Sequence, residues 1–457
     1  MRQIQARHLA AACMLAALSA GASATDVFRL EGFGPISRAM GGTATAYDVG
    51  ASGMMSNPAT LSLMASGTQL HLGLDVVTTD IDTRNRATGE TASSDTHSKN
   101  RGPYAAPEIA YTHRIGPWTL GAGAFAQGGL GTEYGKASFL SRTTSGANSQ
   151  LENSSRLLVL NIPFAASYAV NDRLSVGGSL DAMWMGLNLD MLLGADQVGA
   201  LIGGGRINGS LLPVLGSLPA LDGAHFSVTK NQPIASGVDA WGVGAKLGLT
   251  YKLSTETTLG ASYSLKSRIS DLEGNATLTA VDRVAGKVPL AGKLRIRDLQ
   301  MPASLTLGLS QRINDAWMVT ADLSRVFWKD VMKNIDVGFE ANGGGNLNIL
   351  LPQEYKDQTI LALGTAYRTG NWTLRGGARV ASQALRPALL FAVIPATPTK
   401  HLSAGFSYDF SQQDSVHLAY SHAFEQSMSN ASLPNTSAPI DVHHSQDNLT
   451  VAYTRRF

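Results

Sequence analysis

Apolar and polar residues alternate along segments of about ten residues through most of the chain. One of them, TQLHLGLDV, places Leu70, Leu72 and Leu74 on one face and His71 and Asp75 on the other. A period of two residues is the pattern of a β-strand with one apolar face. The segments AWMVTADLSRVF and HLSAGFSYDF repeat the pattern further along. The chain is therefore predicted to be all-β.

The predicted strands are separated by connections that alternate between short and long. The short ones are polar turns, among them VNDR, INDAW and TGNW, whereas the long ones include 129–155 and 189–235. An even number of strands with short turns at one end and long loops at the other is typical of a bacterial outer-membrane barrel. We predict a 14-stranded antiparallel transmembrane β-barrel. Its strands are expected near 68–79, 104–115, 117–128, 156–170, 173–188, 236–252, 256–271, 294–312, 316–331, 357–369, 371–384, 400–410, 414–425 and 446–457.

Both ends of the chain carry signals of export and membrane insertion. Residues 1–24 have a basic start, a short apolar run and the small-residue site Ala22-Ser23-Ala24, as in a secretory signal peptide. Trp118, Trp317 and other aromatic residues lie where predicted strands meet short turns, as in an interfacial girdle. The terminal Phe457 resembles the signal read by the outer-membrane assembly machinery. We expect the mature chain in the outer membrane of a Gram-negative bacterium, among its lipids and lipopolysaccharide.

Residues 25–66 fit neither a strand nor a helix pattern. The stretch GGTATAYDVGASGMMSNPATLSLM is rich in small residues, and no Lys occurs between Thr25 and Gln69. A barrel of fourteen strands leaves a hole unless something fills it. We expect 25–66 to fold into the lumen as a hatch, or plug, and 67–457 to form the barrel; the alternative is a disordered tail.

Composition excludes several classes of function. The only cysteine, Cys13, and two arginines leave with the signal peptide, so 34 basic residues of the initial 36 remain against 34 acidic ones. That balance does not favour a nucleic-acid partner. We find no metal-ligand pattern, no phosphate loop and no nucleophile elbow, so we predict no cofactor, no metal and no enzyme activity.

Several motifs together resemble one known family. They are FGPISRAMGGTATAYDVGASGMMSNPATLS, GGLGTEYG, MPASLTLGLSQRINDAWMVTADLSRVFWKD, TKHLSAGFSYDF and HLAYSHAF. They resemble the long-chain fatty acid transporter family of Gram-negative outer membranes, which also includes uptake channels for aromatic hydrocarbons. The resemblance covers essentially the whole mature chain. Its hatch motif comprises Gly41, Gly42, Asn57, Pro58 and Ala59.

The resemblance implies a passive channel with no energy-coupling partner. A hydrophobic ligand would land on an apolar extracellular patch, enter a lumen pocket and leave sideways where the third strand is kinked. Gly128, Gly129 and Gly131 are the candidates for that kink, although a turn into the next loop also explains them. Phe28 and Phe33 could act as a movable stopper of the pocket.

The connection 189–235 is too apolar for a loop that faces only water. Its leucines either bind the ligand or pack the loops on one another. A fatty-acid carboxylate would also need a cation, for which Arg206, Arg325 and Lys329 are candidates. The candidate leucines are Leu192, Leu193, Leu201, Leu211, Leu212, Leu215 and Leu218.

We therefore expect a monomeric channel for hydrophobic small molecules, with long-chain fatty acids as the first hypothesis. Aromatic hydrocarbons or alkanes are the alternative within the same family, because the shape of the pocket decides between them. A general porin for small polar solutes and an outer-membrane lipase are the rival classes. A porin would need an open lumen with charged constriction loops.

Overall fold

The computed structural model describes residues 27–95, 103–230 and 235–457; the predicted signal peptide lies outside them. Antiparallel strands pair in sequence order around a closed ring, and β22 pairs with β1 over its whole length. The ring comprises β1 (Gly67–Asn85), β3 (Tyr104–Ile115), β4 (Trp118–Glu133), β5 (Ser154–Ala169), β6 (Leu174–Gly194), β9 (Val238–Lys252), β10 (Thr257–Ser264), β14 (Ser304–Arg312), β15 (Trp317–Val326), β18 (Gln358–Thr369), β19 (Trp372–Ala381), β20 (Lys400–Asp409), β21 (Asp414–Asn430) and β22 (Ile440–Arg456).

Two further strands enter the wall between β6 and β9. β6 pairs with β9 up to Leu187, and from Asp190 it pairs instead with β8 (Leu221–Ser227). β8 pairs with β12 (Leu272–Asp282), which in turn meets β9. A ring traced through the direct β6–β9 ladder has the 14 strands given above, whereas the closed ring traced through β8 and β12 has 16. The predicted count thus omits two strands, because both lie in segments that we expected to be connections.

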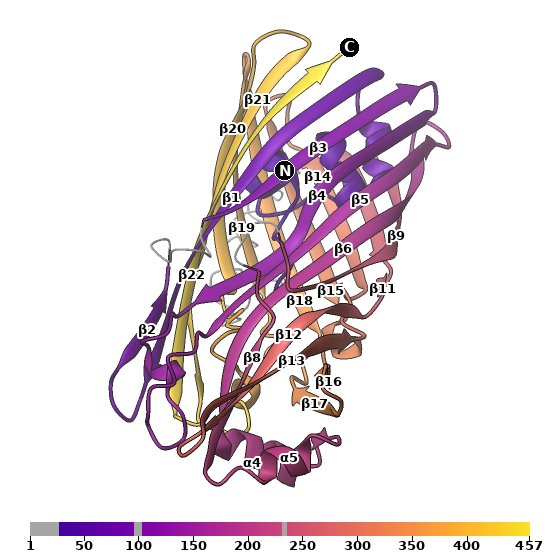
Figure 1. Cartoon of the computed structure of the whole chain (residues 1–457). Helices are drawn as coiled ribbons and strands as arrows, with labels where there is room; N and C mark the ends of the chain where they lie inside the picture. The colour runs from indigo at the N-terminus through magenta and orange to yellow at the C-terminus, as the bar shows by residue number, and fades with distance from the viewer. Residues whose placement is uncertain (1–26, 96–102, 231–234) are drawn as a thin grey trace.

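The short turns gather at one end of the barrel together with the C-terminus, and α4 (Ala195–Gly203) and α5 (Leu212–Gly216) lie at the opposite end (Figure 1). We call these the short-turn end and the long-loop end. At the short-turn end, Val170 N–H donates to Leu174 O and Ile313 N–H to Trp317 O. Asn171 and Asn314 side chains accept from the backbone of their own turns. The predicted VNDR and INDAW turns are confirmed.

The long-loop end contains more regular structure than its sequence indicates. The expected strand 294–312 is interrupted, because Pro302 lacks an N–H and Asp298 adopts a positive φ of 47°. The expected strands 256–271 and 316–331 end early, at Ser264 and Val326. The additional elements there are β2 (Thr91–Ser94), η3 (Phe139–Ser141), β7 (Ile207–Asn208), β11 (Arg268–Ile269), β13 (Gly286–Arg297), η4 (Trp328–Asp330), β16 (Asn334–Ala341), β17 (Asn346–Pro352) and η5 (Pro387–Leu389).

The alternation along the strands separates an apolar exterior from a polar interior. On β1, Leu72 and Leu74 are 42% and 45% exposed, while His71 and Asp75 are buried. Aromatic pairs lie near the short-turn end, including Trp317 with Tyr367, whose ring centroids are 4.7 Å apart. This arrangement suits a barrel with hydrocarbon outside and a polar filling inside. In the described residues, every helix is too short or too polar to cross a bilayer.

The N-terminal segment lies inside the ring. It contains α2 (Gly34–Ala39), η1 (Gly50–Ser52), α3 (Gly53–Ser56) and η2 (Pro58–Leu63), and most of its residues are buried. α2 contacts β19, β20, β21 and β22, whereas η2 contacts β4, β5, β6 and β9. Because these two groups of strands lie on different sides of the ring, the segment is enclosed by the wall. Figure 1 shows its indigo helices behind the strands of the wall.

Candidate functional site

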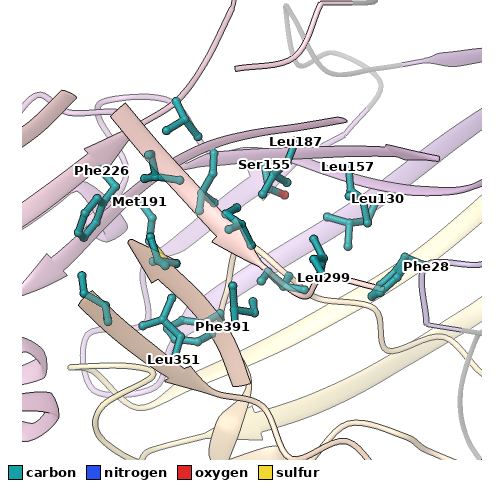
Figure 2. Close-up of a pocket in the computed structure, with 18 of the residues that line it drawn as sticks. Phe28, Leu130, Ser155, Leu157, Leu187, Met191, Phe226, Leu299, Leu351 and Phe391 are labelled. Atoms are coloured by element: carbon teal, nitrogen blue, oxygen red, sulfur yellow. The ribbon is translucent and has the colours of Figure 1, made fainter. Parts of the chain in front are cut away.

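An apolar cavity lies between the N-terminal segment and the long-loop end (Figure 2). It encloses about 920 Å³ of space free of atoms, part of it open to solvent. Its one polar lining residue, Ser155, is already engaged, because its Oγ donates to Val393 O at 2.6 Å. The described lining contains no ionisable side chain. Its residues are Phe28, Leu130, Ser155, Leu157, Leu187, Leu189, Met191, Phe226, Val228, Leu294, Ile296, Leu299, Met332, Ile335, Val337, Ile349, Leu351, Phe391 and Ile394.

Most of the lining comes from strands that present every second residue to the cavity. β6 contributes Leu187, Leu189 and Met191, and β17 contributes Ile349 and Leu351 in the same way. β13 and β16 supply two residues each by the same rule. The strands at the long-loop end therefore form the wall of the cavity that lies opposite Phe28.

Phe28 fills the end of the cavity nearest to β4. Its side chain is 3% exposed and meets the ring of the fully buried Trp328 edge-on, with centroids 4.7 Å apart. Its backbone is tied to β4, because Gly129 N–H donates to Phe28 O at 2.8 Å and Leu30 N–H donates to Gln127 O at 3.1 Å. The N-terminal segment thus holds one aromatic side chain in the cavity through two backbone hydrogen bonds.

Among the residues that the structure describes, the wall has a seam beside this attachment, where β3 and β4 share no ladder. The ladder between β3 and β4 ends at Ile109 and Ala124, although β4 continues to pair with β5 as far as Glu133. A bulge interrupts the β4–β5 register between Ala126 and Gly128. In the described residues, the β3-facing edge of β4 beyond Ala124 hydrogen-bonds to the N-terminal segment at Gln127 and Gly129 and to Ser94 of β2 at Glu133, in place of β3.

The three glycines that we selected on β4 lie along this seam. A side chain at Gly128 would overlap Phe28 O, and one at Gly131 would overlap the phenol of Tyr104. A Cβ at Gly129 would lie 2.8 Å from Leu157 O. Glycine at these positions allows close backbone approach at a bulge, and their role in a lateral exit stays a prediction.

The residues of the predicted hatch motif attach the N-terminal segment to the wall. Gly41 and Gly42 adopt positive φ angles of 70° and 85°, and a Cβ at Gly41 would lie 2.7 Å from Ala378 O. Asn57 is fully buried; its amide donates to Thr45 O at 2.7 Å and to Leu249 O at 3.1 Å. Its carbonyl accepts from Ala59 N–H at 3.1 Å, at the start of η2.

A buried ionic network forms a second attachment, between α2 and the wall. The Arg38 guanidinium is 1% exposed and donates to Glu31 at 3.2 Å and to Asp75 of β1 at 2.7 Å. Glu31 also accepts from Ser421 at 2.6 Å and from Asn448 at 2.8 Å. One arginine therefore joins two carboxylates, one in the N-terminal segment and one in the barrel.

Charge and hydrogen bonding stabilise the ionised forms of Glu31 and Arg38. Burial raises the pKa of Glu31, but the charges of Arg38 and His401 and the hydrogen bonds of Ser421 and Asn448 outweigh it and hold the pKa at about 2. Burial lowers the pKa of Arg38, yet the neighbouring carboxylates raise it above its ordinary value. Both groups stay charged at neutral pH.

A second cavity, of about 1090 Å³ including open solvent, lies toward the long-loop end. It contains apolar residues such as Leu192 and Leu193 and polar ones such as Arg142. It shares Met191 and Phe391 with the apolar cavity. These two side chains separate an outer cavity of mixed polarity from an inner apolar one.

Comparison with known proteins places the chain in one family. The model of the family described as outer membrane protein transport protein (OMPP1/FadL/TodX) matches residues 13–457. The structure of the toluene transporter TbuX of Ralstonia pickettii is 45% identical, with a TM-score of 0.80 over 94% of this chain and 99% of that chain. The toluene transporter TodX of Pseudomonas putida is 41% identical, with a TM-score of 0.84 over 94% and 99%. The long-chain fatty acid transport protein of Escherichia coli O6:H1 is 22% identical over 391 residues, covering 81% of this chain and 80% of the relative. The chain belongs to the OMPP1/FadL/TodX family.

This family consists of outer-membrane transport channels of Gram-negative bacteria and not of enzymes. The chain is accordingly an outer-membrane β-barrel of the class that carries hydrophobic small molecules. The predicted localisation and family are confirmed.

The predicted cations lie away from the apolar cavity of this family member. Arg206 donates to Asn334 at 3.0 Å, and Arg325 pairs with Asp357 at 3.4 Å. Lys329 is exposed on η4. Phe33 also lies outside the cavity lining, because it packs against Met54 and its neighbours within the N-terminal segment.

The predicted leucines of 189–235 mostly pack within the loops. Leu201 and Leu211 are buried in the large hydrophobic cluster, and Leu212, Leu215 and Leu218 are half-buried. We expected Leu192 and Leu193 in a long connection, but β6 runs to Gly194, and its alternation brings the neighbouring Leu187, Leu189 and Met191 to the cavity. Sequence reasoning missed these three. The period of two was the signal that could have found them.

Proposed function

We propose that this chain is a passive uptake channel for small neutral hydrocarbons, monocyclic aromatic compounds above all. The apolar cavity carries the proposal, because the described residues of its lining offer no cation and no free donor to a ligand. An ionised carboxylate buried there without partners would be strongly disfavoured. A hydrocarbon needs none, and each buried methylene-sized group contributes about 0.8 kcal/mol.

Relatedness points in the same direction. The two toluene transporters are 45% and 41% identical to this chain, whereas the fatty acid transporter is 22% identical. The structural neighbours in this identity range also include a monoaromatic hydrocarbon channel, at 40%. Aromatic hydrocarbons therefore replace long-chain fatty acids as our first hypothesis.

Fatty acids are the second candidate, because the two cavities are neighbours that share Met191 and Phe391 in their linings. An acyl chain could occupy the inner cavity while its carboxylate lies in the outer one, whose lining includes the cation Arg142. However, Arg142 already makes a two-pronged pair with Glu90, at 2.6 and 2.7 Å. A carboxylate would have to displace that partner, which weakens this candidate.

We further propose the route of the ligand. The N-terminal segment acts as a plug, the short-turn end faces the periplasm, and the ligand enters through the outer cavity. It then displaces Phe28 and leaves sideways through the seam between β3 and β4. The seam adjoins the cavity, because Leu130 and Phe28 belong to the lining and Gly131 and Gly129 to the seam.

Uptake assays test the substrate and the route together. The protein, expressed in a strain without its own hydrophobic transporters, is expected to accelerate toluene uptake and to leave oleate uptake at background. Gly128→Val should abolish the gain, because the new side chain overlaps Phe28 O. Gly376→Val on β19 is the matched control, since a Cβ there lies 3.9 Å from Ser403 O. Faster oleate uptake with unchanged toluene uptake would refute the hydrocarbon assignment.

A conductance measurement separates the channel from a general porin. In planar lipid bilayers we expect little steady ionic current, because the plug fills the ring. A large steady current would favour the porin. Saturable binding of toluene, measured by competition in detergent, would favour the proposal.

A further inference from the structure

The seam beside β4 is crossed by one aromatic side chain of β3. Tyr104 begins β3, and its backbone pairs with Val77 of β1. It shares the inward parity of Glu108 and Ala110, which are buried. Its side chain is therefore directed to the interior of the barrel, at the height where β3 and β4 have separated.

The tip of Tyr104 rests on the backbone of Gly131. A Cβ built on Gly131 would overlap the hydroxyl and the Cζ of Tyr104, and it would lie 2.9 Å from Cε1. The contact joins two strands that share no ladder at this point, since their last paired residues are Ile109 and Ala124. Side chains alternate along β4, so a Cβ at Gly131 points to the face opposite the cavity-lining Leu130. The phenol of Tyr104 thus spans the seam and meets β4 on the face turned away from the cavity.

The position of this contact relates it to the ligand. Gly131 follows Leu130, which lines the apolar cavity, and the attachment of Phe28 to Gly129 lies two residues away. A ligand that left the cavity through the seam would pass between Tyr104 and the N-terminal segment. Rotation of the Tyr104 side chain would widen the passage without breaking any ladder.

We propose that Tyr104 is the bar of the lateral exit and that it limits the size of the hydrocarbon that can leave. This inference rests on the proposed lateral route. Glycine at position 131 allows this contact, because the side chain of any larger residue would displace the phenol. Selection by size then takes place at the exit, after binding in a cavity that accepts apolar ligands of many shapes.

The test compares a small with a bulky hydrocarbon. In the uptake assay, Tyr104→Ala should raise the ratio of naphthalene to toluene uptake about threefold or more, as expected from loss of about one aromatic contact at the barrier. Tyr104→Phe keeps the ring and should retain the wild-type ratio. Tyr111→Ala is the matched control, because Tyr111 lies on the same strand and is 51% exposed on its outer face. Toluene affinity in detergent should stay the same in all three variants.

A double variant shows whether Gly131 acts through Tyr104. Gly131→Ala should alter the uptake ratio by displacing the phenol, and the same change should have no effect once Tyr104→Ala is present. An unchanged ratio in Tyr104→Ala, with Gly128→Val still blocking toluene uptake, would overturn this inference and leave the lateral route standing. If Gly128→Val also failed to change uptake, the proposed route itself would be wrong.

Discussion

Removal of the Arg38 guanidinium should release the N-terminal segment from the wall. Arg38 is 1% exposed and joins Glu31, 6% exposed, to Asp75, 1% exposed. In Arg38→Met a side chain of similar length remains, but two buried carboxylates lose their counter-charge. Breaking a buried ion pair from one side costs about 3–5 kcal/mol. The equilibrium between docked and free segment should shift by about two to four orders of magnitude.

The measurement is ionic current through single molecules in planar lipid. Arg38→Met should show frequent open events where the parent protein is mostly silent, because an undocked segment leaves a water-filled lumen. Heat-modifiable migration in detergent gels would show that the barrel itself is intact. Arg38→Lys keeps a charge but loses the forked geometry, so its effect should be intermediate.

A second variant tests whether unpaired charge causes the release of the N-terminal segment. If uncompensated charge is the cause, the double variant with Asp75→Asn and Arg38→Met should show fewer open events than Arg38→Met alone, because one unpaired carboxylate is removed. Currents that match the parent in Arg38→Met would show that the network does not hold the segment. Equal currents in the single and double variants would show that packing, and not charge, is responsible.

Three further predictions follow from the same contacts. Phe28→Ala should raise toluene affinity in detergent several-fold, because a ligand no longer competes with a ring at the Trp328 face; unchanged affinity would place the ligand elsewhere. Acid should open the channel: the pKa of Glu31 is held at about 2, below its ordinary 4.5, so its contribution is complete above about pH 4.5 and is lost as the pH falls towards 2. Currents recorded from pH 7 down to pH 3 should thus rise only below about pH 4.5, and a rise already at pH 6 would require another group. Val214→Asp in the middle of α5, where Val214 is 56% exposed, should slow toluene capture without unfolding the loop, whereas Leu211→Asp should also disturb packing; full uptake in Val214→Asp would remove α5 from the path.

The strands could be predicted because lipid and a polar interior impose opposite demands on alternate residues. Leu72 and His71 are adjacent in sequence but face hydrocarbon and the polar interior, so the period of two is strong. β8 escaped prediction because its central residues are buried on both faces, so no alternation stands out. The break between β13 and β14 depends on Asp298 and Pro302, single residues within a pattern that otherwise reads as one strand.

The cavity and the network could be predicted only in part, because both are assembled from distant segments. The predicted Phe28 is in the cavity lining, but its partner Trp328 is 300 residues away and was not selected. Arg38 carried a signal that we did not use, since it is the only Lys or Arg between Arg29 and Arg84. A charge in a segment expected inside a barrel requires a carboxylate partner. Nothing in the sequence pattern identifies that partner as Asp75.

The polarity of the two sides of the N-terminal segment decides which exit costs a hydrocarbon less. Below the apolar cavity, the space between this segment and the wall is lined by hydroxyl and charged side chains, among them Glu31, Asp322 and Arg379. A monocyclic aromatic ring buries about 150 Å² of surface, so its transfer from an apolar site into such a polar space loses about 4 kcal/mol. That loss alone slows passage by about a thousandfold. The lateral exit that we propose would instead release the ring at the outer face of the barrel, where Leu120 and Ile109 are 55% and 53% exposed. A ring that leaves there exchanges one apolar environment for another, so the polar attachment of the N-terminal segment favours lateral exit without movement of the whole segment.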